Sequence, residues 1–244
     1  MNIRRGFLFL LSALLFLICA NAVSVSAMET GFEVGELSEE DKNTVLTNVA
    51  LSSIKQEPAK QPIACFDVSD TGLIAVGQES SSSKKTICVY SADGVFQYGY
   101  TFSCTGSFGV EWDRGNLNIY LVRGDVLLSV TSNGDVVGIT EVQDTIENTS
   151  YINRHIHATQ KTVGDTTYCI RTDIGLLNVF APAYSQIVVT DSAGAEQIIY
   201  DVNSSLQKKM LLTIGVVCVF VAVACVVIFI SFKKKRDSKI PPHI

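Results

Sequence analysis

The sequence has few of the residues that would point to a fibrous or an unfolded chain. Its 17 glycines and 5 prolines in 244 residues are too few for collagen. Only 18% of the residues are charged and 47% are hydrophobic, so the chain can bury a core and intrinsic disorder is not expected. The formal net charge of −5 excludes a histone-like binder of nucleic acid. At about 150 residues per domain, the length predicts one domain or two small ones.

The sequence also lacks the short motifs that mark common active sites. It contains no Gly-x-Ser-x-Gly elbow, no P-loop and no His-Glu-x-x-His sequence. His155 and His157 are two positions apart and would point the same way on a strand, with Asp144 or Glu147 as nearby acids. Without a third ligand at a defined spacing, they make a weak metal site. We therefore predict no catalytic, cofactor-binding or metal-binding residues.

Two pairs of acids are the remaining candidates for catalysis. Asp67 lies three residues before Asp70, and Glu111 lies two residues before Asp113. A glycosidase needs two carboxylates that face each other across a cleft. Each pair here borders a predicted hairpin turn, where Asp is common because it bonds to the turn backbone. We therefore favour a role in the turns.

Four aromatic residues alternate along one predicted strand, at Phe96, Tyr98, Tyr100 and Phe102. An exposed aromatic face of this kind could bind a sugar or a peptide. A core between neighbouring strands explains the same spacing. We favour the core.

Hydrophobic residues are concentrated at the two ends of the chain. Residues 1–27 begin with Arg4 and Arg5, continue with 13 residues at 7–19 that are apolar except for one serine, and end with small residues. This order is typical of a secretory signal, with cleavage after Ala27. The alternative is that the same segment stays as an N-terminal anchor helix.

The second apolar segment, residues 210–232, has 23 residues without a charge. At about 1.5 Å per residue, a helix of this length crosses the roughly 30 Å of hydrocarbon in a bilayer. A buried core helix would show a polar stripe, so we predict a transmembrane helix in contact with lipid. Five basic residues lie in the tail 233–244, whereas only Lys208 and Lys209 precede the span. This asymmetry predicts a cytoplasmic C-terminus at the cell membrane.

The region between the ends, residues 28–209, is predicted to lie outside the cytoplasm. It carries 12 basic and 23 acidic residues, a net charge of −11. This charge disfavours nucleic acid and anionic lipid as partners. Its first part, residues 28–61, is rich in acids and poor in aromatics, which predicts an acidic stalk or linker. Within it, Ser38 followed by the acids at 39–41 resembles the start of a short helix.

Four of the seven cysteines lie in this exterior region, at Cys65, Cys88, Cys104 and Cys169. Four cysteines permit two disulfides among three pairings. No Cys-x-x-Cys pair occurs, so a zinc knuckle is not expected. The neighbours of these cysteines are largely apolar, which makes buried free thiols an equal alternative to disulfides.

Residues 62–202 carry a repeat of about 40 residues. Three segments share a β-branched strand that runs into a polar turn ending in glycine, at 87–94, 127–134 and 187–194. The glycine at the end of each turn suits a positive φ. Helical periodicity is absent up to residue 202, and a polar stretch at 141–160 is interpreted as an inserted loop.

The clearest repeat predicts four strands, at 109–113, 117–122, 126–131 and 135–140. A four-stranded unit of about 40 residues resembles the blades of NHL, WD40 and PQQ-like β-propellers, without matching one of these families. The WD40 signatures are incomplete, because Trp112-Asp113 is the only Trp-Asp pair and lies in the wrong strand.

The resemblance implies a mainly β fold: a partial β-propeller-like arc of about three four-stranded blades over residues 62–202. Closed propellers usually have at least four blades, so an arc of three leaves edge strands that can pair with another chain. A β-sandwich or barrel ectodomain is the alternative.

These features predict a membrane-tethered extracytoplasmic protein that binds or scaffolds an unknown ligand. The expected partners are the lipid bilayer and either another protein or a second copy at the open β edges. One alternative is an extracytoplasmic lyase or glycan hydrolase with acids on the blade turns. Another is a purely structural single-pass membrane protein.

Overall fold

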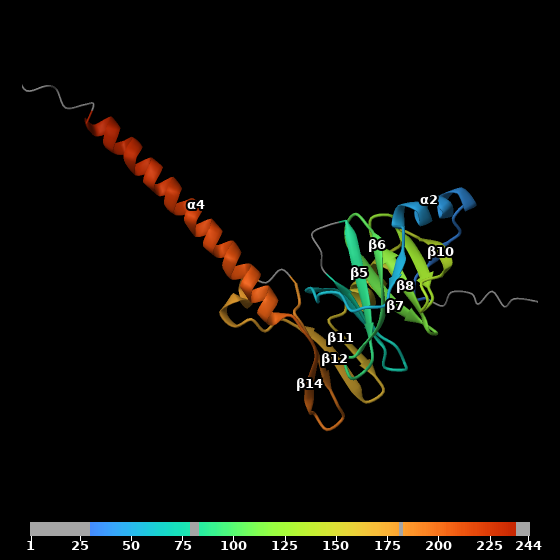
Figure 1. Cartoon of the computed structure of the whole chain (residues 1–244). Helices are drawn as coiled ribbons and strands as arrows, with labels where there is room; N and C mark the ends of the chain where they lie inside the picture. Colours follow the sequence, from blue (N-terminus) through green and yellow to red (C-terminus); the bar gives the residue numbers. More distant parts are fainter. Residues whose placement is uncertain (1–29, 79–82, 181–182, 238–244) are drawn as a thin grey trace, which may run out of the picture.

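The computed structural model describes residues 30–78, 83–180 and 183–237, which form three antiparallel sheets and a long C-terminal helix (Figure 1). The predicted signal or anchor at 1–27 and the end of the tail lie outside these ranges. The prediction of a mainly β chain with an apolar C-terminal helix is confirmed.

The first sheet has the strand order β2-β6-β5-β4-β3. Its strands are β2 (Ser52–Ile54), β3 (Ile63–Val68), β4 (Ile74–Gln78), β5 (Lys84–Tyr90) and β6 (Phe96–Ser103). The last four follow one another along the chain and pair as an antiparallel meander.

The second sheet repeats this plan in the order β1-β10-β9-β8-β7. Its strands are β1 (Val34–Gly35), β7 (Phe108–Asp113), β8 (Asn116–Leu121), β9 (Val126–Val130) and β10 (Val136–Val142). The four strands predicted between 109 and 140 are all present, with ends that differ by no more than two residues.

The third sheet is a meander of four strands, β11-β12-β13-β14. They are β11 (Gln160–Val163), β12 (Thr166–Arg171), β13 (Gln186–Thr190) and β14 (Glu196–Asp201). Gly94, Gly134 and Gly194 close the last hairpin of each sheet with φ values of 78°, 94° and 82°. The positive φ predicted for these three turn glycines is therefore observed.

The described part of the expected stalk, residues 30–61, is folded against the sheets. Helix α2 (Glu39–Val49) begins as predicted, with the Ser38 side chain accepting a hydrogen bond from the Asp41 N–H. On either side of this helix, β1 pairs with β10 and β2 pairs with β6. The segment is tied to the sheets because these pairings satisfy backbone groups at two sheet edges, while Phe32 and Val49 are buried.

Two short helices replace the loop expected at 141–160. They are α3 (Ile146–Tyr151), which Thr145 caps, and the π-helix η1 (Ile152–Ile156). A third short helix, the 3₁₀ segment η2 (Gly175–Phe180), follows β12. Pieces of five or six residues are too short to show a helical period in the sequence. The π-helix η1 contacts β3 and β7.

The three sheets stack face to face with the first sheet in the middle. One hydrophobic core joins the first and second sheets and includes Ile87, Tyr100, Val110 and Leu128. A second core lies on the opposite face of the first sheet and joins it to the third. The outer face of the second sheet is covered by η1, whose Ile156 packs with Phe32, Tyr120, Leu127 and Val142. The third sheet therefore packs on the first and not on the second, which precedes it in the sequence.

Helix α4 (Asn203–Asp237) contains the predicted span and leaves the sheets directly after β14 (Figure 1). Its stretch Asn203–Ile230 is long and apolar enough to cross a membrane, and the rest of the described chain buries none of its most apolar window. At its base, Leu206 is buried and Lys209 donates a hydrogen bond of 2.9 Å to the Gln61 side chain.

Candidate functional site

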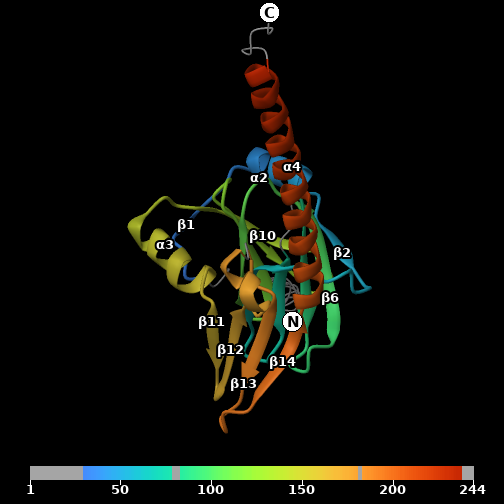
Figure 2. The same ribbon diagram turned by 90° about the vertical axis from the view of Figure 1, so that its left-hand side faces the viewer.

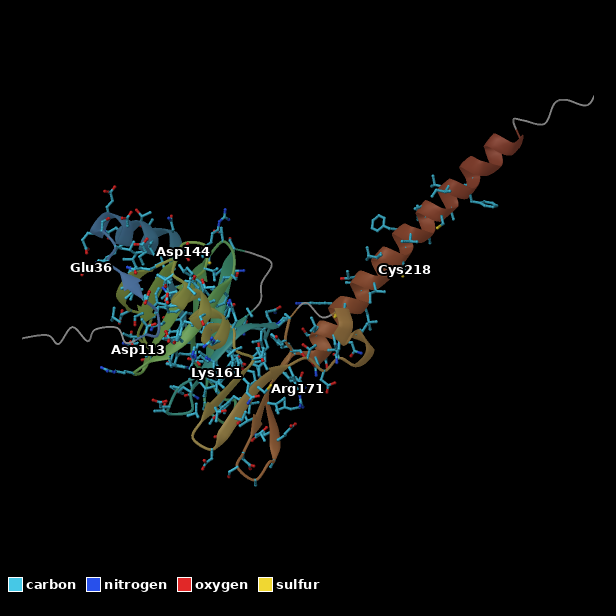
Figure 3. The ribbon with its side chains drawn as sticks, turned by 180° about the vertical axis from the view of Figure 1, so that it is seen from behind. Glu36, Asp113, Asp144, Lys161, Arg171 and Cys218 are labelled. Atoms are coloured by element: carbon cyan, nitrogen blue, oxygen red, sulfur yellow. The ribbon has the colours of Figure 1, made fainter. Side chains whose placement is uncertain are left out.

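Two of the four candidate acids, Asp67 and Glu111, lie where β3, β7 and η1 approach one another. Asp67 accepts a hydrogen bond of 2.8 Å from the Trp112 N–H. Its other oxygen lies 3.0 Å from Nζ of Lys161, which also donates to the His155 carbonyl at 2.7 Å. Figure 3 labels Lys161 among the strands of the β region. The Asp67 carboxylate is thus held by one bond from β7 and one from β11.

Glu111 is held from two other segments. The Thr30 hydroxyl donates to one carboxylate oxygen at 2.7 Å, and the Tyr151 hydroxyl donates to the other. Burial, together with the bond to Glu111, raises the pKa of Tyr151 above its usual value. The Tyr151 ring packs edge-on against Phe32, with centroids 4.9 Å apart. The neutral phenol and the carboxylate therefore form a stable donor–acceptor pair.

We call Asp67, Glu111, Tyr151 and Lys161 the polar junction. Its hydrogen bonds and ion pair connect β3, β7, β11, α3 and the segment before β1. These bonds therefore hold the three sheets in a fixed position relative to one another. The acids it joins come from different predicted pairs, because the chain brings β3 beside β7. Neither Tyr151 nor Lys161 could be found from the sequence, since both approach from the helical insertion or just after it.

The histidine pair does not have the geometry expected of a strand. His155 belongs to η1 and His157 caps its end, so their side chains do not share a face. The His155 ring stacks on Tyr151 with centroids 4.6 Å apart. Within the described residues, no group of three or more His, Cys, Asp or Glu side chains could hold a metal ion.

The alternating aromatics belong to the core and not to an exposed face. Tyr100 and Phe102 are buried between the first and second sheets. A shift in the pairing of β5 with β6 between Val89 and Tyr90 turns Phe96 to the opposite face, where it packs against Tyr90 with centroids 6.0 Å apart. Because of this bulge, aromatic residues that alternate regularly in the sequence of β6 pack into two different cores.

No disulfide joins the four cysteines between residues 28 and 209, all of which the structure describes. Cys65 and Cys104 belong to the core between the first and second sheets, whereas Cys88 faces the third sheet. Burial raises the pKa of the Cys88 thiol to about 12. The alternative of buried thiols is therefore the one observed for Cys65, Cys88 and Cys104.

The sheets also present a surface of turns on the side away from α4. The hairpin turns of the third sheet point away from the helix (Figure 2). The turn at 91–94 lies against β14, because a Cβ at Gly94 would be 2.7 Å from the Ile199 carbonyl oxygen. The turn at 69–72 lies beside it, with Gly72 next to Ala92. We call the turns 69–72, 91–94 and 191–194 the turn face.

A hollow of about 300 Å³ continues the turn face toward the second sheet. Asp70 from the first sheet and Arg114 from the second line it, together with the Trp112 ring. The lining holds two acids, one base and one aromatic residue, which suits contact with a polar chain. One of the acids, Asp67, belongs to the polar junction, and its carboxylate is already engaged.

No family model, no curated protein and no solved structure matches this chain.

Proposed function

We propose that this chain is a membrane-tethered extracytoplasmic protein whose β region binds or scaffolds another protein. The observation that carries the proposal is the opposite placement of tether and turns. Helix α4 continues from one end of β14, whereas the turn face lies toward the other end (Figure 2). A domain held in this way presents its turns to whatever lies beyond the membrane surface. Turn surfaces on a rigid scaffold are common binding sites.

A partial propeller-like arc is our preferred description of the β region. Each sheet contains a four-stranded meander in chain order, and the sheets stack face to face. The first strands of the meanders also lie together, since β3 contacts both β7 and β11. This arrangement supports an arc around those first strands. A three-layer sandwich is the alternative that the same stacking supports.

The polar junction favours binding over catalysis. Asp67 and Glu111 each accept bonds at both carboxylate oxygens. A glycosidase would need one of its carboxyl groups to donate a proton and the other to face the substrate. Acids engaged in this way serve to hold the sheets, and no observation favours the enzyme alternative.

Cysteine labelling of intact cells tests the location. Ser192→Cys places a thiol in the exposed turn of the third sheet, and Ser238→Cys places one in the tail. We expect a membrane-impermeant maleimide to label Ser192→Cys in intact cells and to label Ser238→Cys only after permeabilisation. The reverse pattern would place the β region in the cytoplasm and overturn the proposal.

Site-specific crosslinking tests the binding role. A photo-crosslinking residue at Asp93, in the turn face, should give a discrete adduct of higher mass in intact cells. The matched control is Thr44, an exposed residue of α2, which should give no such adduct. Absence of any adduct from Asp70, Asp93 and Asp191 would contradict binding through the turn face.

A further inference from the structure

The outer strands of the three sheets are covered to different extents. In the first sheet, β2 pairs with β6 along Gly99–Thr101. In the second sheet, β1 pairs with β10 at Glu141 and Val142. In the third sheet, no described segment pairs with the outer strand β14. Among the described residues, short fifth strands cover two of the sheets, and the third edge is left open.

The open part of β14 is the stretch Glu196–Ile198. All three residues are exposed, and Ile198 keeps 48% of its surface accessible. Beyond them, the turn at Gly94 packs on Ile199. The free stretch therefore equals β2 in length and has an apolar side chain at its end. Natural edge strands usually avoid such an exposed apolar residue, because an open edge can pair with another chain.

The charge around this edge is negative. Strand β14 carries two acids, Glu196 and Asp201, and no basic residue, and the turn before it carries Asp191. Glu196 pairs with Arg171 at 3.1 Å, but both side chains are about half exposed, and a pair in this position contributes little stability. Glu196 can therefore exchange Arg171 for a cation of a partner. On a strand, Glu196 and Ile198 share one face of the sheet.

A second copy of this chain does not suit the edge. Helix α4 starts directly after β14, so two copies in one membrane would present their β14 strands in the same direction. Parallel pairing would then place Glu196 close to its equivalent in the other copy. Like charges at neighbouring positions of paired strands are destabilising.

We propose that Glu196–Ile198 accepts an extended segment of a different protein as a fifth strand, with a basic residue two positions from an apolar one. Backbone hydrogen bonds would give the affinity, the basic side chain would reach Glu196, and the apolar side chain would cover Ile198. This inference rests on the proposed binding function and names the chemistry of its partner.

The test uses the full chain in nanodiscs of phosphatidylcholine, which carries no net charge. The probe is a labelled peptide with the sequence Thr-Lys-Thr-Val-Thr-Lys-Thr, blocked at both ends, which places lysines two positions on either side of valine. We expect fluorescence anisotropy to show binding of this peptide. A peptide with glutamates in place of lysines should bind at least tenfold more weakly. A backbone-methylated version of the lysine peptide should not bind, because it cannot pair with a strand.

Hydrogen exchange and three variants locate the site. The lysine peptide should protect amides within Glu196–Ile198 and not those of β6 or β10. Glu196→Lys and Ile198→Lys should each weaken binding at least tenfold. Val137→Lys is the matched control, because Val137 is an exposed apolar residue on β10, the last strand of the meander in the second sheet. This change should leave binding of the lysine peptide unchanged.

Three results would overturn the inference: equal binding of the acidic or methylated peptide, protection of another strand, or an equal loss in Val137→Lys. Self-association through β14 that Ile198→Lys abolishes would also overturn it. Adducts from the turn face that persist in Glu196→Lys and Ile198→Lys would leave the proposed function standing. If the β region were labelled from the cytoplasm, the proposed extracytoplasmic function would be wrong, but peptide binding at β14 could still be observed.

Discussion

At the residue scale, two ion pairs of almost equal length have different surroundings. Asp67 and Lys161 lie 3.0 Å apart with side chains 11% and 19% exposed. Arg171 and Glu196 lie 3.1 Å apart with side chains 41% and 53% exposed. Water stabilises an exposed charge that loses its partner, whereas a buried charge without a partner keeps its desolvation cost. Burial, and not distance, therefore sets the contribution of each pair.

Lys161→Met should lower the free energy of unfolding by about 3 kcal/mol, because it leaves the Asp67 carboxylate buried without its cation. The matched change at the exposed pair, Arg171→Met, should cost less than about 1 kcal/mol. Denaturant unfolding of the full chain in detergent micelles measures both. Adding Asp67→Asn to Lys161→Met should restore part of the loss. Equal costs for the two single changes would contradict this account of the polar junction.

A glycine on β7 has a packing role that the sequence does not indicate. A Cβ at Gly109 would overlap Cγ2 of Ile156, so only glycine lets η1 lie this close to the second sheet. Overpacking of this kind typically costs about 1–3 kcal/mol, and we expect that loss for Gly109→Ala. Gly124→Ala is the control, because its nearest neighbour would be Val126 at 3.8 Å. Thermal unfolding that ranks the two variants equally would exclude this role for Gly109.

At the scale of elements, the positions of the strands can be predicted from their own sequences, whereas the positions of the short helices cannot. Some strands of the meanders, such as β4 and β9, are buried throughout and read as short apolar runs, and each last hairpin ends in glycine, so sequence patterns locate them. Helix α3 and η1 depend on contacts that the chain makes only after folding. Asn148 shows this: its side chain accepts from the Glu33 N–H at 2.8 Å and donates to the carbonyls of Glu33 and Gln143. One amide thus ties α3 to the residue before β1 and the residue after β10.

Asn148→Ala should remove these three hydrogen bonds and lower the free energy of unfolding by about 3 kcal/mol, at about 1 kcal/mol for each bond. Hydrogen exchange should also become faster at Val34 and Gly35, because β1 loses its attachment to α3. Asn43→Ala changes an exposed asparagine on α2 and should leave both measurements nearly unchanged. Unaltered exchange in β1 would show that other contacts hold this strand.

At the scale of the whole molecule, the fold buries several tyrosines, some between the stacked sheets and others beneath α3 and η1 on the outer face of the second sheet. Burial, together with the hydrogen bond to the Asp125 carboxylate, raises the pKa of Tyr120 to about 12. Burial, as the largest cause, also raises the pKa of Tyr90, Tyr98, Tyr100, Tyr151 and Tyr200 above the usual value. The fold therefore favours the neutral phenol at each of these positions.

This burial predicts alkaline unfolding. An unfolded tyrosine ionises near pH 10. Because the folded pKa of Tyr120 is higher, its contribution to stability is complete below about pH 10 and is lost as the pH rises toward 12. Phenolate absorbance near 295 nm should appear together with loss of the β-sheet signal in far-UV circular dichroism. Tyr120→Phe should make the decline in stability over this range less steep, and an unchanged slope would contradict the assignment.

The sequence by itself determined the repeating meander, the turn glycines, the α2 cap and the apolar helix. Each of these depends on neighbours along the chain: side-chain alternation, a positive φ, a cap three residues ahead, or length without charge. Only the tertiary structure decided that the first sheet lies in the middle, that Asp67 meets Lys161 and Glu111 meets Tyr151, and that no strand of the described residues covers β14. These outcomes depend on contacts between segments that are distant in the sequence. Examples are the packing of η1 on the outer face of the second sheet and the packing of the third sheet on the first.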